Sequence, residues 1–483
     1  MPTLQRIRDL LQQPIPGKVL NATLCLKWIE DVNQQYISLL RQNIASNILV
    51  DLKLSIIFWR KKLLHELLTS RTQWANENPA PLVEILAALR IYLQPQQQSQ
   101  IASILDDNKR YAEIMAYQGM RHQDYPEFDE SAGPGVDLDI TANRTSSWSF
   151  AKWKKNTAFS HYDFVGDGVR YRGVIFRPGD VLLTNVSLDG NGLYTSLTDP
   201  KGFCSHSAFF AILEDQDNHY PVLIETYEKG VRPVPLNVFL GPRFCAYAEI
   251  YRHHDISEQH TTVINRAAKA IVDSVKGYNF DSEDPDRTYM SCTSVGRFLY
   301  QDAGLTPAQT ISSLKHPQIK KNLTRLGYTF FELFAPVDYL LNDNFQCVGW
   351  VDNNQIERLL AQELVDGRFR QLFSEREIAP ENFPILYKLN RWGLRHIRGQ
   401  TQIGKIISFV EGFDHITLPK GPNELLAIIR LAESQLGKST VAIRKVVEQK
   451  INDMDEFDLD ELAADPTVKS VLNRTLELPW LPK

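Results

Sequence analysis

The stretch YMSCTSVGRFLY, residues 289–300, places a cysteine among small hydroxyl residues and follows it with apolar residues at helical spacing. Val295, Phe298 and Leu299 recur at three- and four-residue steps, which is typical of a helix with one buried face. Cys292 then lies in the first turn of that helix. The partial positive charge and free N–H groups of a helix N-terminus favour a thiolate over a thiol. We therefore interpret Cys292 as a candidate nucleophile, which requires a nearby base.

The composition of the 483-residue chain indicates a globular protein and disfavours several other classes. Hydrophobic residues make up 43% and charged residues 23% of the chain, which is sufficient for two or three folded domains. The net charge of -5 argues against a dedicated nucleic-acid binder, because such proteins carry a basic domain. The five cysteines are scattered without CxxC spacing, so neither a zinc ribbon nor a disulfide framework is expected.

The N-terminal residues lack the apolar core of a secretory signal peptide. The most hydrophobic early run is 48–59, but Asp51 and Lys53 interrupt it and it is too short to cross a bilayer. We therefore expect a cytoplasmic protein without a transmembrane segment. A protein secreted as an effector without a classical signal peptide would have the same features.

The N-terminal part of the chain, residues 1–120, carries helical patterns without a catalytic motif. Apolar residues follow a helical stripe in 54–68 and again in 82–89. The glutamine-rich run 94–100 between helical patterns is interpreted as a polar connector. We expect these residues to form a helical domain.

The C-terminal part, residues 346–483, is expected to form a second helical region. Helices are predicted at 356–364, 425–436 and 441–451. The acidic run 453–465 is interpreted as a solvated linker or helix face, with a docking site for a basic partner as the alternative.

The centre of the chain has a different pattern. Residues 121–169 contain turn residues and many aromatics, which indicates a loop-rich connector or a lid. Residues 170–345 alternate short apolar runs with turns and are expected to form a β-rich domain around one helix that begins at Cys292. The fold class is therefore α+β. The predicted strands are 174–176, 181–184, 207–213, 222–227 and 246–252, and a helix is predicted at 258–275.

A histidine and a carboxylate lie upstream of the cysteine in a predicted hairpin. His206 stands at the start of one strand, and Glu225 lies among apolar residues of the next, where a carboxylate is uncommon unless it is paired. If the chain turns near 215–217, His206 falls opposite or diagonal to 225–228. Glu225 is then placed to orient the imidazole.

Two alternatives remain for this carboxylate. Glu228 is a rival for the position beside the imidazole. Glu225 can instead form a structural ion pair with Arg232 or Arg243. The spacing alone does not choose among these arrangements.

In this order the residues resemble the permuted papain-like hydrolases, the YiiX/YaeF-type relatives of the NlpC-type peptidases and of the lecithin:retinol acyltransferases. In that group the usual order of cysteine before histidine is inverted. The pattern consists of a Gly-Asp turn before a strand, a histidine at a strand start, an acid in the next strand, a late tyrosine segment and a cysteine that opens a helix. The matching residues here are Gly179-Asp180, His206, Glu225, the segment 277–281 with Tyr278, and Cys292, and the segment 334–340 resembles the one that closes such domains.

The resemblance implies a central permuted papain-like domain with an antiparallel sheet, acting on an amide or ester bond through a thioester. It implies Cys292 as nucleophile, His206 as base and Glu225 as the third member of a triad. Tyr278 is implied as an oxyanion donor beside the backbone N–H of Cys292. The expected substrate is a peptide, a peptidoglycan-like amide or a lipid acyl group, with no cofactor and no metal. The alternative is an inactive scaffold of this fold whose helical flanks bind a protein partner.

A group of histidines offers a second chemistry. His253, His254, Asp255 and His260 follow a predicted strand. Their spacing differs from that of a helical metal motif, in which two histidines share one face. A zinc enzyme is therefore the less favoured interpretation.

Overall fold

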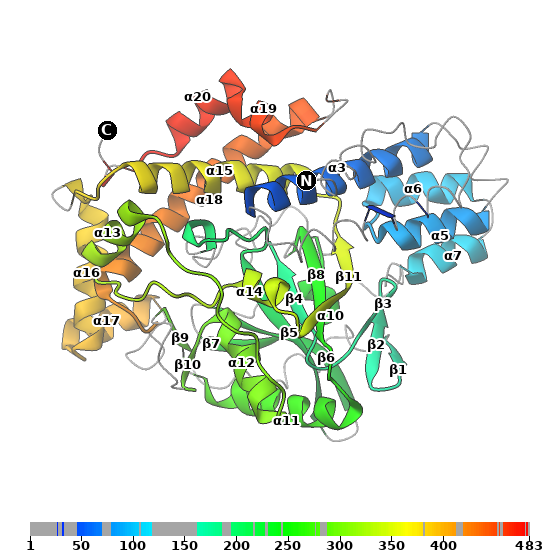
Figure 1. Cartoon of the computed structure of the whole chain (residues 1–483), viewed down its shortest axis with the longest axis horizontal. Coiled ribbons are helices and arrows are strands. Elements are labelled where there is room, and N and C mark those ends of the chain that lie inside the picture. Colours follow the sequence, from blue (N-terminus) through cyan, green and yellow to red (C-terminus); the bar gives the residue numbers. More distant parts are fainter. Residues whose placement is uncertain are drawn as a thin grey trace.

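The fold is that of a computed structural model of the chain. Within the described residues, a helical group comes first, an antiparallel sheet with its own helices follows, and a second helical group comes last (Figure 1). The described residues are 27, 31–32, 46–69, 79–105, 108–117, 162–185, 195–215, 218–227, 230–242, 245–275, 277–280, 287–379, 382–411, 419–451, 454, 457–478 and 480–481.

A six-stranded antiparallel sheet lies at the centre, in the order β11-β8-β4-β5-β6-β7. The predicted hairpin is confirmed as β5 and β6, which pair from Ala208 with Glu225 to Asp215 with Asn218. The strands are β4 (Val181–Thr184), β5 (His206–Asp215), β6 (Asn218–Tyr227), β7 (Gly230–Pro235), β8 (Tyr247–His253) and β11 (Phe345–Asp352). The α+β fold class is therefore confirmed as a mixture of helices and antiparallel sheets.

Alternation along β5 sends successive side chains into two separate cores. Phe209 and Ala211 pack against the helices α11 (Glu258–Ser274) and α12 (Cys292–Asp302). Phe210, between them, packs on the opposite face with β2 (Gly168–Tyr171), β3 (Val174–Phe176) and the short helix α10 (Leu236–Phe239). The sheet therefore separates the helix that carries Cys292 from the small sheet on the other side.

The small sheet corrects part of the connector prediction. β1 (Asp163–Val165), β2 (Gly168–Tyr171) and β3 (Val174–Phe176) pair antiparallel, so the end of the predicted loop 121–169 is strand. Arg172 and Gly173 both have positive φ (49° and 72°), as in a tight hairpin turn that matches the twist of its strands. The rest of that predicted connector, up to residue 161, lies outside the described residues.

The N-terminal helices bury apolar stripes, as the sequence predicts. Leu54 and Phe58 of α3 join the core of the C-terminal helices, whereas Ile56 and Leu63 pack with α5. The prediction of a polar connector at 94–100 is wrong, because most of these residues lie in the helix α6 (Pro95–Ile104). Pro at the first helical position suits a helix start, and the side chain of Gln97 accepts from the backbone N–H of Gln94. These helices are α3 (Ser46–Thr69), α5 (Pro79–Leu89), α6 (Pro95–Ile104) and α7 (Asn108–Tyr117).

The C-terminal region is helical, as predicted, but two of its predicted helices are one. α18 is continuous through 437–440, where Thr440 bonds to the carbonyl of Leu436 within the helix. Gly437 lies within this helix, where a glycine is about 1 kcal/mol less favourable than an alanine. Burial of Leu436 and Ile443 on either side outweighs that cost. The helices are α13 (Pro317–Arg325), α14 (Pro336–Leu341), α15 (Ile356–Glu375), α16 (Ile385–Arg398), α17 (Gln402–Glu411), α18 (Asn423–Ile451), α19 (Leu459–Ala464) and α20 (Pro466–Thr475).

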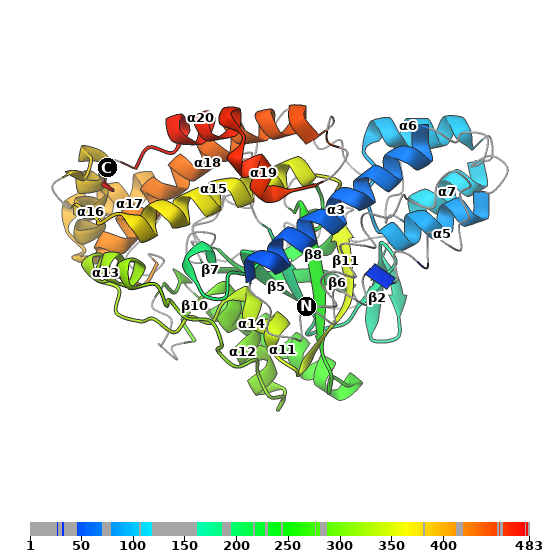
Figure 2. The ribbon, with the colours of Figure 1, turned by 45° about the horizontal axis from the view of Figure 1, so that its top comes forward.

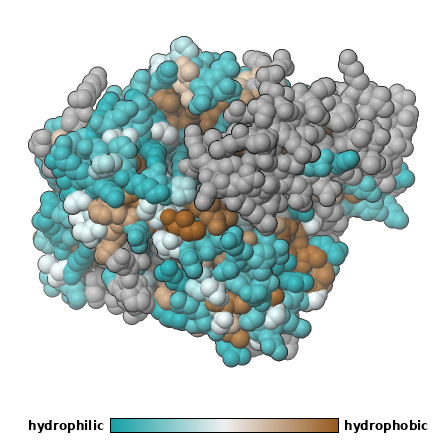
Figure 3. Space-filling view, viewed as in Figure 1, coloured by the Kyte–Doolittle hydropathy of each residue, from teal (hydrophilic) through white to brown (hydrophobic). Residues whose placement is uncertain are grey.

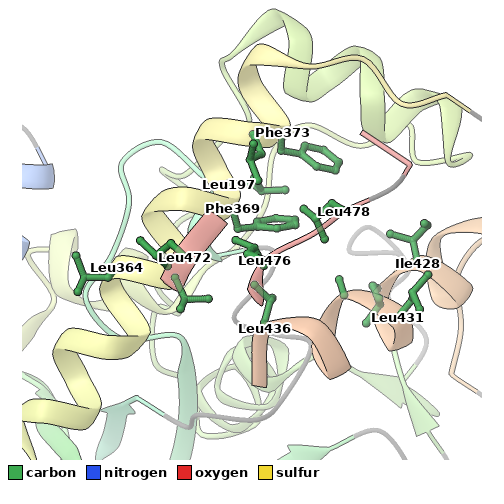
Figure 4. Close-up of a cluster of buried hydrophobic side chains, with 14 of the residues drawn as sticks. Leu197, Leu364, Phe369, Phe373, Ile428, Leu431, Leu436, Leu472, Leu476 and Leu478 are labelled. Carbon is green, nitrogen blue, oxygen red and sulfur yellow. The ribbon is translucent and has the colours of Figure 1, made fainter. Parts of the chain in front are cut away.

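The largest core joins α15, α18 and the chain end. Phe369 and Phe373 of α15 stack at 5.4 Å between ring centroids, and Leu472, Leu476 and Leu478 lie around them (Figure 4). The acidic residues of 453–465 have a structural role at two points: Asp458 caps α19 and Asp465 caps α20. A carboxylate at a helix N-terminus accepts otherwise unpaired backbone N–H groups.

α3 and α15 pack together across one end of the sheet (Figures 1 and 2). Lys53 of α3 forms a buried ion pair with Glu249 of β8, and the hydroxyls of Tyr247 and Tyr251 donate to the same carboxylate. Most of the described residues on the face seen in Figure 3 are hydrophilic, and a hydrophobic area lies near its centre, close to α14. Among the described residues, no helix is long and apolar enough to span a membrane.

Candidate active site

Cys292 is the first residue of α12, as the sequence predicts. Ser291 is the N-cap: its hydroxyl accepts from the N–H of Ser294 at 3.2 Å, and the Ser294 hydroxyl accepts from the N–H of Ser291 at 2.8 Å. Thr226 of β6 donates to the carbonyl of Ser291 at 3.3 Å. This reciprocal capping sets the start of the helix. The small hydroxyl residues around the cysteine therefore decide where its sulfur lies.

The segment 334–340 holds the same turn of α12 from the other side. The hydroxyl of Thr293 donates to the carbonyl of Phe334 at 2.7 Å, and that of Tyr339 donates to the carbonyl of Thr293 at 2.9 Å. Asp338 fixes this segment, because its carboxylate accepts from the N–H and the hydroxyl of Ser312. The residue that follows the cysteine is thus anchored by a segment more than forty residues away.

α12 approaches the sheet closely at Gly296. A Cβ at this position would lie 2.1 Å from a ring carbon of Phe209 and 2.4 Å from the hydroxyl of Tyr339. Glycine is required where helix and strand come this near. One turn further on, Tyr300 donates to the carbonyl of Gly179 at 2.7 Å.

The Gly179-Asp180 turn anchors the far end of α12 and the start of β4. Gly179 has a φ of +93°, and a Cβ there would lie 2.6 Å from the side chain of Ile256. Asp180 is fully buried and binds Arg252 through both carboxylate oxygens at 2.7 Å. A buried carboxylate needs such a partner. The turn therefore has a structural role, which leaves the chemistry to other residues.

His206 lies between Cys292 and Glu225, all three being buried. Its Nε2 is 3.2 Å from Oε2 of Glu225, and the imidazole is also hydrogen-bonded to Cys292. Ala208 is the register partner of Glu225, so His206 is diagonal to that carboxylate, as predicted. Arg232 of β7, directly opposite Glu225, binds its other oxygen at 2.6 Å. The imidazole contact and the ion pair, considered as alternatives from the sequence, therefore coexist.

The three groups shift one another's pKa in a consistent direction. Burial would lower the pKa of His206, but its hydrogen bonds to Cys292 and Glu225 raise it to about 10. Burial would raise the pKa of Glu225, yet Arg232 and His206 lower it to about 2. The pKa of Cys292 is lowered in spite of burial, by His206 first and then by the backbone N–H of Ser207. The arrangement favours a thiolate beside an imidazolium.

Donors surround the sulfur besides the histidine. The hydroxyl of Tyr278 donates to it at 3.9 Å, and the N–H of Ser207 also contacts it. Tyr278 is positioned by a short parallel pairing of β9 (Gly277–Tyr278) with β10 (Tyr289–Met290), just before the helix. The N–H of Ser207 carries no signal in the sequence, because any residue after the histidine supplies one.

A narrow cavity of about 60 Å³ opens beside Cys292. That volume corresponds to about two water molecules. Among its described lining residues there is no carboxylate and no cation. The lining combines hydroxyl residues (Thr195, Thr198, Ser205, Tyr278, Ser291, Thr293 and Tyr328) and Asn279 with apolar ones (Phe280, Leu333, Phe334, Ala335 and Pro336).

The C-terminal helices hold one wall of this cavity. Arg370 of α15 donates to the carbonyls of Ser196 and Thr198 at 2.8 and 2.7 Å and to the carboxylate of Asp199 at 2.5 Å. Thr198 lines the cavity, so Arg370 positions that wall. The sequence analysis missed this residue, since nothing in the local pattern of α15 distinguishes it from the other arginines of that helix.

The sequence also offered Glu228 as a rival carboxylate and a group of histidines as metal ligands. Glu228 lies outside the described residues. His253 is engaged within the protein: its Nε2 contacts the carbonyl of Thr306 at 3.0 Å and its Nδ1 accepts from the N–H of Asp255. His260 contacts Ser257 at the start of α11. In the part of the chain that the structure describes, no three His, Cys, Asp or Glu side chains are grouped to hold a metal.

Comparisons of the chain with protein-family models, with curated proteins and with solved structures found no match.

Proposed function

We propose that the protein is a cysteine-dependent hydrolase or acyltransferase of permuted papain-like fold, which acts on an amide or ester bond. The observation that carries the proposal is the buried contact series from Cys292 through His206 to Glu225, with a cavity beside the sulfur. A nucleophile, a base and a group that orients the base are the minimum for covalent acyl transfer. The order of these residues in the chain supports the permuted arrangement.

In the first step, the Cys292 thiolate attacks the carbonyl carbon of the substrate and a C–S bond forms. The C=O electron pair moves to the oxygen, which becomes an oxyanion. The N–H of Cys292 at the helix start and the hydroxyl of Tyr278 are the donors proposed for it. Such donors act most strongly where water is excluded, as in a buried site.

Collapse of this intermediate breaks the C–N or C–O bond. His206, as imidazolium, gives its proton to the leaving nitrogen or oxygen, and a thioester remains on Cys292. Water or another acceptor then attacks the thioester while His206 takes its proton, and the thiolate is regenerated. Glu225, held by Arg232, stabilises the imidazolium throughout. Hydrolase and acyltransferase differ only in the acceptor.

The lining of the cavity supports an uncharged acyl group as substrate. Apart from Cys292 itself, no charged side chain is present among its described residues to pair with a carboxylate or an amine. The hydroxyls of Thr195, Thr198 and Ser205 offer hydrogen bonds, and Phe334 and Pro336 offer apolar contact. We therefore favour a neutral peptide, peptidoglycan-like or lipid acyl group over a charged terminus.

Mass-mapped alkylation with iodoacetamide tests the proposal. Cys292 should react at mildly acidic pH, whereas Cys347, a partly exposed thiol whose pKa is raised by burial, should not. An activated acyl ester should leave an acyl adduct on Cys292. His206→Ala should abolish both modifications at Cys292 and leave Cys347 unchanged.

Equal reactivity of Cys292 in the wild type and in His206→Ala would overturn the assignment. An unreactive Cys292 in the folded wild type would instead favour the inactive scaffold, with its helical flanks as the functional surface.

A further inference from the structure

α16 and α17 form a tightly packed helical hairpin at one side of the C-terminal region (Figure 1). A Cβ on Gly404 of α17 would lie 2.1 Å from the carbonyl oxygen of His396, and one on Gly393 of α16 would lie 3.7 Å from Ile407. The inner side of α16 is buried through Leu394 and Ile397. The hairpin is thus a folded unit attached to the main core along one side.

The outer side of the same hairpin exposes large apolar residues. On α16 they are spaced as i, i+4 and i+7, which places them in one stripe opposite the buried side. Ile385 is 75% exposed, and Ile406 of α17 is 66% exposed. A contiguous apolar surface of this kind marks a contact site. The exposed large hydrophobic residues of the hairpin are Ile385, Leu386, Leu389, Trp392, Ile403 and Ile406.

The charge of the hairpin is opposite to that of the whole chain. Its only acidic residue is Glu411, against five lysines and arginines, while the chain as a whole carries -5. Lys388 and Lys405 are exposed, one on each helix beside the apolar residues. The basic residues are Lys388, Arg391, Arg395, Arg398 and Lys405. Arg391 and Arg395 form ion pairs with Glu424 of α18, so the charge available to a lipid surface is chiefly that of Lys388 and Lys405.

We propose that the α16–α17 hairpin binds the surface of an anionic membrane. An interfacial helix places its apolar stripe at the boundary of headgroups and acyl chains, with lysine and arginine at the level of the lipid phosphates. Trp392 suits that boundary, where tryptophan is enriched. The combination of exposed apolar residues with surrounding cations distinguishes a lipid surface from a purely apolar partner. The proposal does not depend on the chemistry of Cys292.

The hairpin is connected to the cavity wall by hydrogen bonds from the side chain of Arg398 and by backbone hydrogen bonds of Lys420. Arg398, in the last turn of α16, donates to the carbonyls of Pro419 and Gly421 at 3.1 and 2.6 Å. Between them, the N–H of Lys420 donates to the carbonyl of Tyr278 at 2.8 Å, and the N–H of Phe280 donates to the carbonyl of Lys420 at 3.0 Å. Both Tyr278 and Phe280 line the cavity. The hairpin and the cavity wall are therefore linked through residues 419–421.

Sedimentation of the full-length protein with vesicles tests this surface. We expect binding to phosphatidylcholine vesicles that contain about one-third phosphatidylglycerol, and weak binding to phosphatidylcholine alone or at high salt. Lys388→Gln with Lys405→Gln should weaken partitioning by about tenfold or more. Leu389→Gln with Ile406→Gln should weaken it at least as much. Vesicles should shift the tryptophan fluorescence of the wild type, and this double variant should lose that shift.

Matched controls lie elsewhere on the surface. Val441→Gln on α18, 54% exposed, and Lys315→Gln, an exposed lysine, should bind vesicles as the wild type does. Cys292→Ala should also bind normally, which separates this proposal from the catalytic one. Circular dichroism melting establishes that each variant is folded.

Three outcomes would overturn the proposal. The first is a wild type that ignores anionic vesicles at low salt, and the second is hairpin variants that bind as tightly as the wild type. The third is a self-associating wild type that does not bind vesicles and becomes monomeric in Leu389→Gln with Ile406→Gln, because the stripe would then be an interface between copies of this chain.

Discussion

The site around Cys292 and the α16–α17 hairpin depart in opposite directions from the usual division between polar surface and apolar core. The site buries His206 and Glu225, and Arg232 and Cys292 supply their partners within the chain. The hairpin exposes a stripe of apolar residues whose outer side is solvent. A buried charge is tolerated only when it is paired. A large exposed apolar surface is uncommon on a soluble protein and usually marks a contact site. The buried charges at the site thus have their partners within the chain, whereas the apolar residues on the outer side of the hairpin face solvent.

The largest expected effect is the loss of chemistry in Cys292→Ala. Turnover of an activated ester and formation of the acyl adduct should fall by at least about 10³-fold, because the bond-forming atom is gone. Cys245→Ala, which removes a buried thiol whose pKa is raised by burial, should retain turnover. Comparable turnover in both variants would contradict the role of Cys292.

The next effect is on the pH dependence of thiol reactivity. The thiolate–imidazolium ion pair should persist from below the ordinary pKa of a thiol up to about pH 10, where the imidazolium loses its proton and the thiolate remains. In His206→Gln, the main group that opposes the effect of burial is gone, so the pKa of Cys292 should rise and alkylation near neutral pH should fall by about 10³-fold. The measurement is the alkylation rate as a function of pH. An alkylation profile that is the same in His206→Gln and in the wild type would contradict the claim that His206 lowers the pKa of Cys292.

Glu225 should make the folded state sensitive to acid. Its pKa is lowered to about 2, so the stability it contributes is fully present above the ordinary carboxyl pKa and is lost as the pH falls toward 2. The amount is up to about 3 kcal/mol. Glu225→Gln should lose less stability over that range in urea titrations. Glu214→Gln, an exposed carboxylate in the same hairpin, is the control and should keep the wild-type slope.

Gly296→Ala tests how closely α12 must approach β5. The added methyl group meets Phe209, so the free energy of unfolding should fall by about 1–3 kcal/mol and the alkylation rate of Cys292 should fall with it. Gly367→Ala in α15 is the matched control, since nothing lies within 4 Å of its Cβ. Gly367→Ala should raise the free energy of unfolding by up to about 1 kcal/mol, and thermal melts of both variants measure the difference. Equal effects would show that the close approach is not required.

The smallest change in the free energy of unfolding is expected for substitutions on the outer side of the α16–α17 hairpin. Leu389→Gln with Ile406→Gln should change the free energy of unfolding by no more than about 0.5 kcal/mol for each residue, because neither is part of a core. Leu394→Gln on the buried side of the same helix should cost about 3 kcal/mol or more. A large loss for the outer pair would mean that these residues already have a partner within the chain.

Local patterns were sufficient for the elements that hold the candidate site. The β5–β6 hairpin, the start of α12 and the diagonal placement of His206 and Glu225 follow from alternation, from a short turn and from capping by Ser291. Each depends on residues that are close in the chain. The errors arose where burial against other helices outweighs the local pattern: a glutamine run was interpreted as a connector, and 425–436 and 441–451 were interpreted as two helices, but α6 and α18 are continuous there.

Contacts between segments far apart in the chain could not be predicted from local sequence patterns. Nothing near Thr293 indicates that Phe334 and Tyr339 hold it, and nothing near Arg370 indicates that it holds the cavity wall. The exposed stripe on α16 has the same composition as a buried one. Only its position in the fold shows which side of the helix is covered.

The sequence by itself determined that a thiol would begin a helix and that a histidine and a carboxylate would share a hairpin. The tertiary structure decided that the thiol and the hairpin meet, because segments far apart in the chain bury the three groups together and remove the water that would otherwise separate their charges. It also decided that Glu225 has both an imidazole and a guanidinium partner. The pKa of Cys292 is low only because burial and pairing occur at the same place.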